Sequence, residues 1–277
     1  MKDRAIDIAG GRAAEAGGRA AEAGGLNPLR EYVQSRILGV MQEAGAMAPL
    51  AFIGGTALRF VYRTPRYSED LDFTLEGDAE AFDLRVLWSR LERRLRREGY
   101  AVRVRISDSG PVARALVGFV GLPADAGLSP HADEVLWVKI EVDTDPPAGA
   151  GLAVSVVDRH GLLRLQHHDL PSLFAGKLAA ILARDYAKGR DFYDLLWYLT
   201  RDDAVAPNLV LLGNALWQTA PRVAEATTAD WREAVRRRLS NVDWEDARRD
   251  VAPFLEQRRD VDLITAETFD ALLGGAR

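Results

Sequence analysis

Phe52-Ile-Gly-Gly-Thr-Ala-Leu-Arg59 is the stretch around which the rest of the chain is organised. The apolar residues before Gly54 predict a strand, and the residues after Gly55 follow a helical pattern, so the glycines form the turn between them. A turn of this kind presents backbone N–H groups at the positive end of a helix, and glycines let a ligand approach the backbone closely. We therefore expect Gly54, Gly55 and Thr56 to bind a phosphate, with a simple N-cap as the alternative role for Thr56.

A pair of carboxylates follows in the short run Asp70-Leu-Asp-Phe-Thr-Leu75. Residues two apart in a strand point to the same face, so Asp70 and Asp72 share one face while Leu71 and Phe73 share the other. Oxygen ligands arranged in this way suit hard divalent cations such as Mg²⁺. A glycine turn followed closely by paired carboxylates predicts a site for a nucleoside triphosphate (NTP) and its metal ions. Solvated charges on an edge strand are the alternative.

The same residues resemble a known family. Gly54-Gly-Thr-Ala-Leu58 and Arg66-Tyr-Ser-Glu-Asp-Leu-Asp-Phe73 look like the signature of the AbiEii/AbiGii-type nucleotidyltransferase toxins. Residues 173–180 and 188–195 are similar to that family's downstream motif, and the resemblance extends from about residue 52 to residue 199. It implies the fold of the polymerase-beta-like nucleotidyltransferase superfamily and a role in bacterial toxin–antitoxin or abortive-infection systems.

A third carboxylate is expected from the strand predicted by the alternating residues 135–142. Its polar face carries Lys139, Glu141 and, just beyond, Asp143. The resemblance favours Glu141 as the partner of the two aspartates, and Asp143 is the alternative. It then implies a two-metal Mg²⁺ site whose ligands are Asp70, Asp72 and Glu141.

Further residues are expected to serve the triphosphate. Lys177 lies beside an apolar stripe, where an ammonium needs an anionic partner unless it extends to solvent. Asp191 begins the next predicted helix, where its charge would complement the helix dipole, and the resemblance carries it into the catalytic site. Ser68 is expected to bind the triphosphate or to close a turn, and Arg66 to contact phosphate or to support the loop. Asp194 is predicted to be a surface charge.

The composition excludes several kinds of site. The chain has 277 residues, no cysteine, and 41 acidic against 36 basic residues, which gives a net charge of -5. Cysteine nucleophiles and thiolate zinc sites are excluded, and four histidines argue against a histidine metal centre at His167-His168. A broad cationic surface is disfavoured. No apolar run approaches the ~20 residues needed to span a bilayer, so we expect a cytoplasmic protein without a membrane partner.

Three segments of an α+β fold are predicted. Residues 1–26 contain a seven-residue Ala/Gly-rich repeat and are expected to form a flexible or partly helical leader. Residues 27–160 are expected to form a nucleotidyltransferase lobe with a mixed sheet, and residues 161–277 a helical lobe across a cleft. Strands are predicted at residues 49–53, 70–75, 100–106, 112–120, 135–142 and 152–157. Helices are predicted at residues 27–44, 56–62, 80–98, 170–184, 191–199, 208–219, 230–239, 244–255 and 266–273.

The resemblance also implies a reaction. A nucleoside monophosphate would pass from an NTP to an acceptor hydroxyl with release of pyrophosphate, and the 3′ end of tRNA would be the acceptor, as in mycobacterial-type members. A cognate antitoxin protein or its transcript would be the partner. The net acidity favours a small-molecule or protein acceptor instead, and a nucleotide-binding regulatory module without turnover is the non-enzymatic alternative. The arginine clusters at 93–97 and 232–238 are predicted to be solvated helix surfaces, with RNA contact as an alternative for the second.

Overall fold

The computed structural model describes residues 1–16, 19–77, 83–108, 110–184, 186, 188–224 and 230–274. The chain forms two compact units that are interleaved in sequence. The first consists of Met1–Tyr62, Tyr67–Asp145 and Val154–His167, and the second of Arg63–Arg66, Pro146–Ala153 and His168–Arg277. None of the described helices is long and apolar enough to cross a lipid bilayer.

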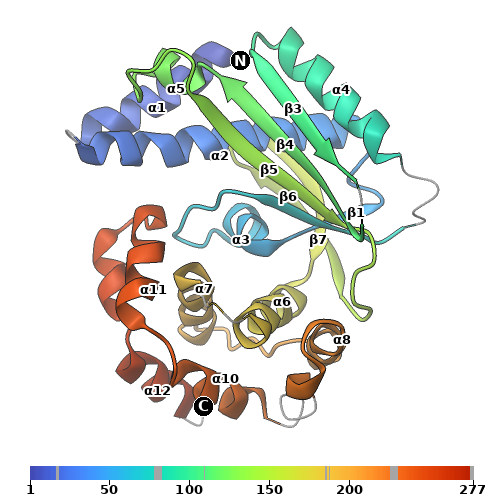
Figure 1. Cartoon of the computed structure of the whole chain (residues 1–277), viewed down its shortest axis with the longest axis vertical. Coiled ribbons are helices and arrows are strands. Elements are labelled where there is room, and N and C mark those ends of the chain that lie inside the picture. The colour runs from blue at the N-terminus through green and yellow to red at the C-terminus, as the bar shows by residue number, and fades with distance from the viewer. Residues whose placement is uncertain are drawn as a thin grey trace. The chain divides into compact units, whose positions relative to one another are not determined.

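A mixed sheet forms the centre of the first unit (Figure 1). In the part of the chain that the structure describes, it has seven strands in the order β3-β4-β5-β2-β1-β7-β6. β2 runs parallel to β5 and β1 parallel to β7, while the pairs β1–β2, β3–β4 and β4–β5 are antiparallel. The strands are β1 (Leu50–Ile53), β2 (Leu71–Leu75), β3 (Val102–Ser107), β4 (Val112–Val120), β5 (Val135–Asp143), β6 (Leu152–Asp158) and β7 (Leu162–His168).

Two long helices pack in the first unit, the first behind strands β3 to β5 and the second beside β3 in the view of Figure 1. These are α2 (Arg19–Glu43) and α4 (Leu84–Arg97), which buries Trp88 among its leucines. The even-numbered residues of β5, from Leu136 to Val142, are buried as the alternation predicts. Asp83 caps α4, and Gly99, with a φ of 93°, follows the C-cap residue Glu98. The start predicted at residue 80 lies outside the described residues.

The amino-terminal segment is more regular than expected. The first helix, α1 (Lys2–Ala16), packs beside α2, and α2 begins at Arg19 rather than at Asn27, with Pro28 inside it. Alanine has the highest helix propensity, which favours this outcome despite the glycines. In the described part of α1, Ala5 and Ala9 are fully buried. The repeat at residues 9–25 is helical on both sides of residues 17 and 18, which lie outside the description.

Strand β7 was absent from the sequence prediction. Its buried Leu163 and Leu165 alternate with Arg164 and Gln166, so a period-two signal was present but short. The pairing of Phe52 with His167 places β7 beside β1. Both His167 and His168 are buried, and His167 Nε2 is 2.9 Å from Ser155 Oγ.

The second unit is mainly helical, as predicted. Asp169, Asn208 and Asp230 cap their helices with side-chain oxygens. The helix predicted at residues 244–255 ends at Val251, because Pro253 cannot continue the hydrogen-bond ladder. The described α-helices of this unit are α6 (Leu170–Ala183), α7 (Gly189–Leu199), α8 (Leu209–Thr219), α10 (Trp231–Leu239), α11 (Trp244–Val251) and α12 (Ala266–Gly274). Two 3-10 helices, Ala252–Phe254 and Arg258–Leu263, lie between α11 and α12.

Candidate functional site

The glycine turn lies directly against one of the aspartates. Gly54 is the first residue of α3 (Gly54–Tyr62) and has a φ of 76°, a conformation that favours glycine. A Cβ atom at this position would lie 2.5 Å from Asp72 Oδ2. In the antiparallel pairing of β1 with β2, Ile53, the residue before Gly54, lies opposite Asp72. Glycine is therefore required at position 54 both for its conformation and for the approach of the carboxylate.

Thr56 ties the helix to the segment that enters β2. Its buried hydroxyl donates a hydrogen bond to the backbone carbonyl oxygen of Asp70. The N-cap role considered for Thr56 is wrong, because α3 already begins at Gly54 and this hydroxyl donates to a carbonyl rather than accepting from an N–H. The N–H groups of the first turn, which includes Gly55, have no partner within the helix.

A second buried side chain positions the same segment. Gln34 of α2 donates from Nε2 to the carbonyl oxygens of Ser68, at 3.0 Å, and Glu69, at 2.9 Å. Together with Thr56 it holds three consecutive carbonyls just before β2. No sequence pattern singles out Gln34, because a glutamine at a core position of a helix shows its function only when the neighbouring loop is known.

The register of the sheet brings the third carboxylate to the pair. In the parallel β2–β5 ladder, Asp72 lies opposite Glu141, while Asp143 lies opposite Thr74. Adjacent strands are about 4.8 Å apart, and opposed residues share a face. Glu141 is therefore the immediate neighbour of Asp72, and Asp143 lies two pairs further along the ladder.

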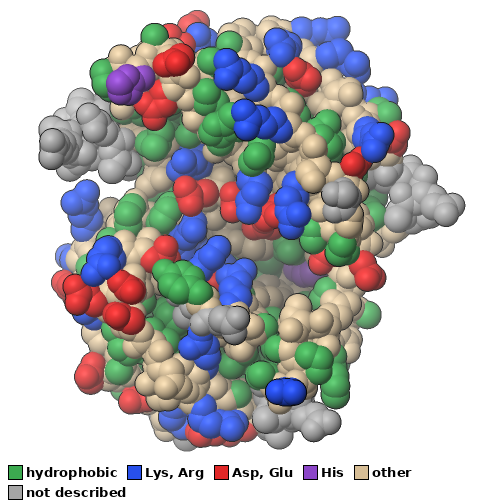
Figure 2. All heavy atoms as spheres, in the orientation of Figure 1, with side chains coloured by type: hydrophobic (Ala, Val, Ile, Leu, Met, Phe, Trp, Pro, Cys, Tyr) green, Lys and Arg blue, Asp and Glu red, His purple; other side chains and the backbone are tan. Residues whose placement is uncertain are grey.

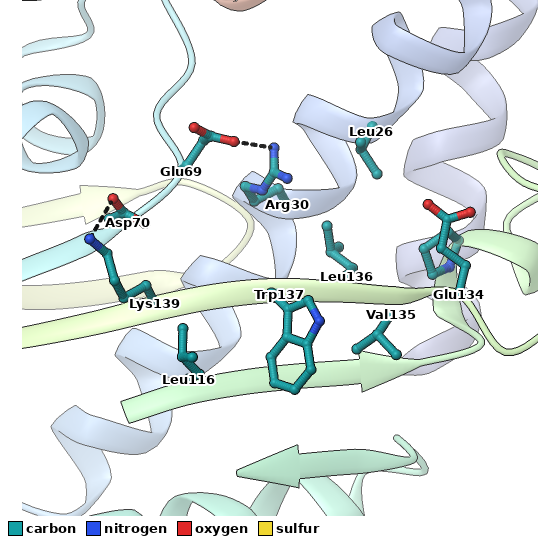
Figure 3. A pocket seen from close by; sticks show the side chains of 11 residues that line it. Leu26, Arg30, Glu69, Asp70, Leu116, Glu134, Val135, Leu136, Trp137 and Lys139 are labelled. Atoms are coloured by element: carbon teal, nitrogen blue, oxygen red, sulfur yellow. Dashed lines mark ion pairs between the residues drawn. The ribbon is translucent and has the colours of Figure 1, made fainter. Parts of the chain in front are cut away.

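Two cations hold Glu141 in place. Lys139 Nζ lies 2.7 Å from Glu141 Oε2 and 3.3 Å from Asp70 Oδ2. Arg114 Nε of β4 lies 2.7 Å from the other oxygen, Glu141 Oε1. Figure 3 shows Lys139 extending from β5 toward Asp70. No sequence motif indicates a role for Lys139 or Arg114, although Lys139, two residues before Glu141, shares a strand face with it.

These contacts change the protonation of the cluster. Partial burial acts to raise the pKa of Glu141, but the hydrogen bonds from Lys139 and Arg114 outweigh it and lower the pKa below its usual value. Burial likewise acts to lower the pKa of Lys139, but its contacts with Glu141 and Asp70 raise it overall. Among the described residues no cation forms an ion pair with Asp143, and burial raises its pKa.

The donor set is suited to a hard cation. Asp70, Asp72 and Glu141 offer oxygen ligands only, which is the preference of Mg²⁺. Within the described residues, no three His, Cys, Asp or Glu side chains converge closely enough to hold an ion. Asp70 and Glu141 converge instead on the ammonium of Lys139, so a cation already stands between two of the three carboxylates.

A cavity of about 410 Å³ opens beside this cluster in the first unit (Figure 3). Asp70 and Lys139 lie at one end of it and Glu134 at the other, and the ion pair of Arg30 with Glu69 also lines it. Its other walls include Leu26, Leu116 and Trp137. A volume of this size is in the range of small-ligand pockets.

Asp194 belongs to a buried ion cluster in the second unit. Arg66 donates to both of its carboxylate oxygens, from Nε at 2.6 Å and from Nη2 at 2.5 Å. Lys177 Nζ lies 2.8 Å from Asp194 Oδ2. The prediction of a surface charge at Asp194 is wrong, since its side chain is 0% exposed. Position 194 follows Asp191 by three residues, so the two carboxylates share the buried face of α7.

The same cluster contains the predicted ligand Lys177 and the predicted catalytic residue Asp191. Lys177 Nζ is 3.0 Å from Asp191 Oδ1, and Arg184 Nη1 is 2.7 Å from Asp191 Oδ2. The Lys177 side chain is only 12% exposed, so it does not extend to solvent. Arg66 is 1% exposed and supports its loop through Asp194, which agrees with the structural alternative for this residue.

The charges of this cluster stabilise one another. Burial acts to lower the pKa of Lys177, but the charges of Asp194 and Asp191 outweigh it and raise the pKa. Burial acts to raise the pKa of Asp191, but the charges of Lys177 and Arg184 lower it overall. Counting Arg66, three cations face two carboxylates, so the cluster keeps an excess of one positive charge.

Comparison with solved structures finds nucleotidyltransferase-like proteins. A putative nucleotidyltransferase from H. pylori is 19% identical, with 86% of this chain and 95% of that chain covered and a TM-score of 0.45. An antigenic nucleotidyltransferase-like protein from Paracoccidioides brasiliensis is 16% identical, with 72% and 93% covered and a TM-score of 0.43. No curated protein matches the chain.

The comparison with protein families is more decisive. A match to the family described as "Nucleotidyl transferase AbiEii toxin, Type IV TA system" covers residues 36–274. This range includes the glycine turn, all three carboxylates and the buried ion cluster of the second unit. The chain therefore belongs to the AbiEii nucleotidyltransferase toxin family.

Proposed function

We propose that this protein transfers a nucleoside monophosphate from an NTP to the 3′ end of tRNA and releases pyrophosphate. One observation carries the proposal: Gly54, Asp72 and Glu141 lie together at the amino-terminal end of α3, in a chain that belongs to a nucleotidyltransferase family. We propose that the reaction takes place in the cytoplasm, where both substrates occur. We further propose that a cognate antitoxin, as protein or transcript, opposes the activity.

In this proposal the first turn of α3 binds the triphosphate. Backbone N–H groups of Gly54, Gly55 and Thr56 would donate to its oxygens at the positive end of the helix. Gln34 and Thr56 keep the approach to Asp70 in one conformation, which reduces the entropy lost on binding. Ser68, which lies in the segment between α3 and β2, remains a proposed hydrogen-bond donor to the triphosphate.

The carboxylates would hold the metal. Asp70, Asp72 and Glu141 would be the ligands of Mg²⁺, which when bound neutralises phosphate charge and lowers the pKa of an attacking hydroxyl. Lys139 has to leave the position between Asp70 and Glu141 for a metal to enter. Glu141 would then orient the acceptor hydroxyl for in-line attack, a matter of positioning rather than covalent chemistry.

Lys177 remains a proposed ligand of the triphosphate, and Asp191 a proposed catalytic residue. The excess positive charge of their cluster supports a role in binding the triphosphate. Asp191 would keep Lys177 charged and oriented. Arg66 would act through Asp194 rather than on the phosphate.

The test is a labelling experiment. The purified protein is incubated with Mg²⁺, each of the four α-labelled NTPs and total bacterial tRNA, beside an Asp72→Asn variant and an Asp158→Asn control. Asp158 is exposed at the end of β6, so its variant carries the same change of charge away from the turn. Label should enter RNA with the wild type and the control but not with Asp72→Asn.

The other outcomes identify the alternatives. Label in protein or in small molecules would replace tRNA as the acceptor and keep the transferase. If calorimetry shows NTP binding but no acceptor becomes labelled, the protein is a nucleotide-binding module and the catalytic proposal is wrong.

A further inference from the structure

Strands β3, β4 and β5 present an open face with a repeated pattern of side chains. Cross-strand pairing aligns Arg103 with Gly118 and Gly118 with Trp137, and in the next row Arg105 with Leu116 and Leu116 with Lys139. Residues that lie directly opposite one another share a face. A third row ends at Glu141, which lies opposite Arg114 and opposite Asp72. The face therefore leads from the β3 edge to the carboxylates.

The β3 side of this face is positively charged. Arg103 and Arg105 are exposed, and in the described part of the chain no hydrogen bond or ion pair holds either one. Arg114 and Lys139 are balanced by Glu141 and Asp70. Figure 2 shows Lys and Arg side chains gathered over β3 to β5, next to a group of Asp and Glu side chains. Two arginines without an ion pair among the described residues thus share a sheet face with Glu141, in a protein whose net charge is -5.

An aromatic side chain lies within this face. A Cβ atom at Gly118 would come within 2.7 Å of the Trp137 ring, so only glycine lets the indole lie against β4. The guanidinium of Arg105 lies 5.0 Å from the Trp137 ring centroid. Trp137 also lines the 410 Å³ cavity, whose apolar walls include Leu116 and which has Asp70 and Lys139 at one end (Figure 3).

We propose that this basic sheet face, defined by Arg103, Arg105 and Trp137, binds the single-stranded end of an RNA acceptor. The arginines would pair with phosphates, which requires Arg105 to move off the Trp137 ring, and one base would then enter the cavity and stack on the indole. Glu134 lines the same cavity, so the phosphates are expected on the β3 side, away from this carboxylate. The RNA must be single-stranded, because a paired base cannot offer its ring to the indole.

This inference rests on the proposed transferase function and locates its acceptor. An RNA bound along these rows would have its terminal 3′ hydroxyl directed toward Glu141, which lies opposite Asp72. The face accounts for how a chain with an acidic composition can bind a polyanion, since the charges that matter are local.

The experiment is a binding titration with the full-length protein, without NTP or Mg²⁺. The probe is a fluorescein-labelled 12-nucleotide single-stranded RNA of mixed sequence with a free 3′ hydroxyl, followed by fluorescence anisotropy at several salt concentrations. The variants are Arg103→Glu with Arg105→Glu, Trp137→Leu and Trp137→Phe. The matched control is Arg93→Glu with Arg97→Glu, two exposed arginines of α4 that no hydrogen bond or ion pair holds among the described residues.

Each variant has a distinct expected result. The double arginine variant should weaken binding by about ten-fold or more and reduce the slope of log K against log salt by about 1.4, because each single-strand phosphate contact contributes about 0.7. Trp137→Leu should weaken binding by about ten-fold with an unchanged slope, while Trp137→Phe should retain most of the affinity. The control should match the wild type, and thermal unfolding should show that all variants are folded.

Equal losses in the control and in the double arginine variant, or no loss in either set, would overturn the proposal. A duplex of the same sequence that binds as tightly as the single strand would also overturn it, as would a wild type that binds no RNA. NTP binding to the wild type is measured in parallel by calorimetry with Mg²⁺. A wild type that binds NTP but not RNA removes this inference alone, whereas one that binds RNA but not NTP removes the proposed function.

Discussion

At the residue scale, Gly54 decides how closely the turn approaches the carboxylates. Gly54→Ala should destabilise the protein by about 1–3 kcal/mol through its left-handed backbone, and should also displace Asp72. Gly99→Ala is the matched control, because Gly99 has a φ of 93° and a Cβ atom there would meet nothing within 4 Å. Thermal unfolding and nucleotidyl transfer are measured on both. Similar loss of stability with transfer abolished only in Gly54→Ala is the expected result, and equal activities would show that the contact with Asp72 is unimportant.

Lys139 is the residue expected to control the entry of metal. Lys139→Met removes the cation between Asp70 and Glu141, so Mg²⁺ binding measured by calorimetry should tighten by about ten-fold or more, since no charge has to be displaced. Lys2→Met is the control, because Lys2 pairs with Asp125 at 2.6 Å outside the site. Unchanged affinity in Lys139→Met would mean that the ammonium does not compete with the metal.

At the element scale, Glu31 links α2 to α3 and to the turn between β6 and β7. Its carboxylate meets Arg59 of α3 at 2.5 Å, and Arg159 and His160 between β6 and β7 at 3.0 Å and 3.3 Å. Burial acts to raise the pKa of Glu31, but the hydrogen bond to His160 and the arginine charges lower it to about 2 from an ordinary 4.5. The charged form is therefore favoured by folding.

This shift predicts a dependence of stability on pH. The stabilisation should be fully present above about pH 4.5 and lost as the pH falls toward 2, with an amplitude of about 3 kcal/mol. Glu31→Gln should remove this part of the pH dependence, while Glu43→Gln, at an exposed position of the same helix, should keep it. Denaturant unfolding between pH 2 and pH 6 is the measurement. An unchanged slope in Glu31→Gln would contradict the assignment.

At the scale of the whole molecule, the short segment Arg63–Arg66 belongs to the second unit, although the residues on either side of it belong to the first. Besides the Asp194 ion pair, this segment is held by a backbone bridge between Arg66 and Leu255 and by the bond from Glu256 N to Pro65 O, at 3.2 Å. Asp194→Asn removes the negative charge that compensates the buried cations Arg66 and Lys177. The free energy of unfolding of the second unit should therefore fall by about 3–5 kcal/mol. Chemical denaturation compares it with Asp246→Asn on the exposed face of α11. A loss below about 1 kcal/mol in Asp194→Asn, the usual size for a surface pair, would show that the cluster is not needed for stability.

Local patterns account for much of the fold. The alternation in residues 112–120 and 135–142, the capping of α6 by Asp169 and the glycine turn at Gly54 all depend on neighbours within a few residues. The strand β7 carried the same kind of signal over fewer residues, and for that reason it was missed. Two helix ends were less well predicted. Pro253 ends α11 at Val251 although the apolar pattern continues, and in the leader the helix propensity of alanine outweighs the glycines, so that α2 begins at Arg19.

The sequence by itself determined the glycine turn, the spacing of Asp70 and Asp72, the mixed α+β order of elements and the helical second half, because backbone sterics and side-chain periodicity act over short distances. Tertiary structure alone decided that β2 lies beside β5 with Asp72 opposite Glu141, and that Lys139, Gln34 and Arg114 surround this pair. It also decided that Asp194 is buried with Arg66, 128 residues away in the chain. Strand order and register arise from packing between distant segments, and no local pattern encodes which charges they will bring together.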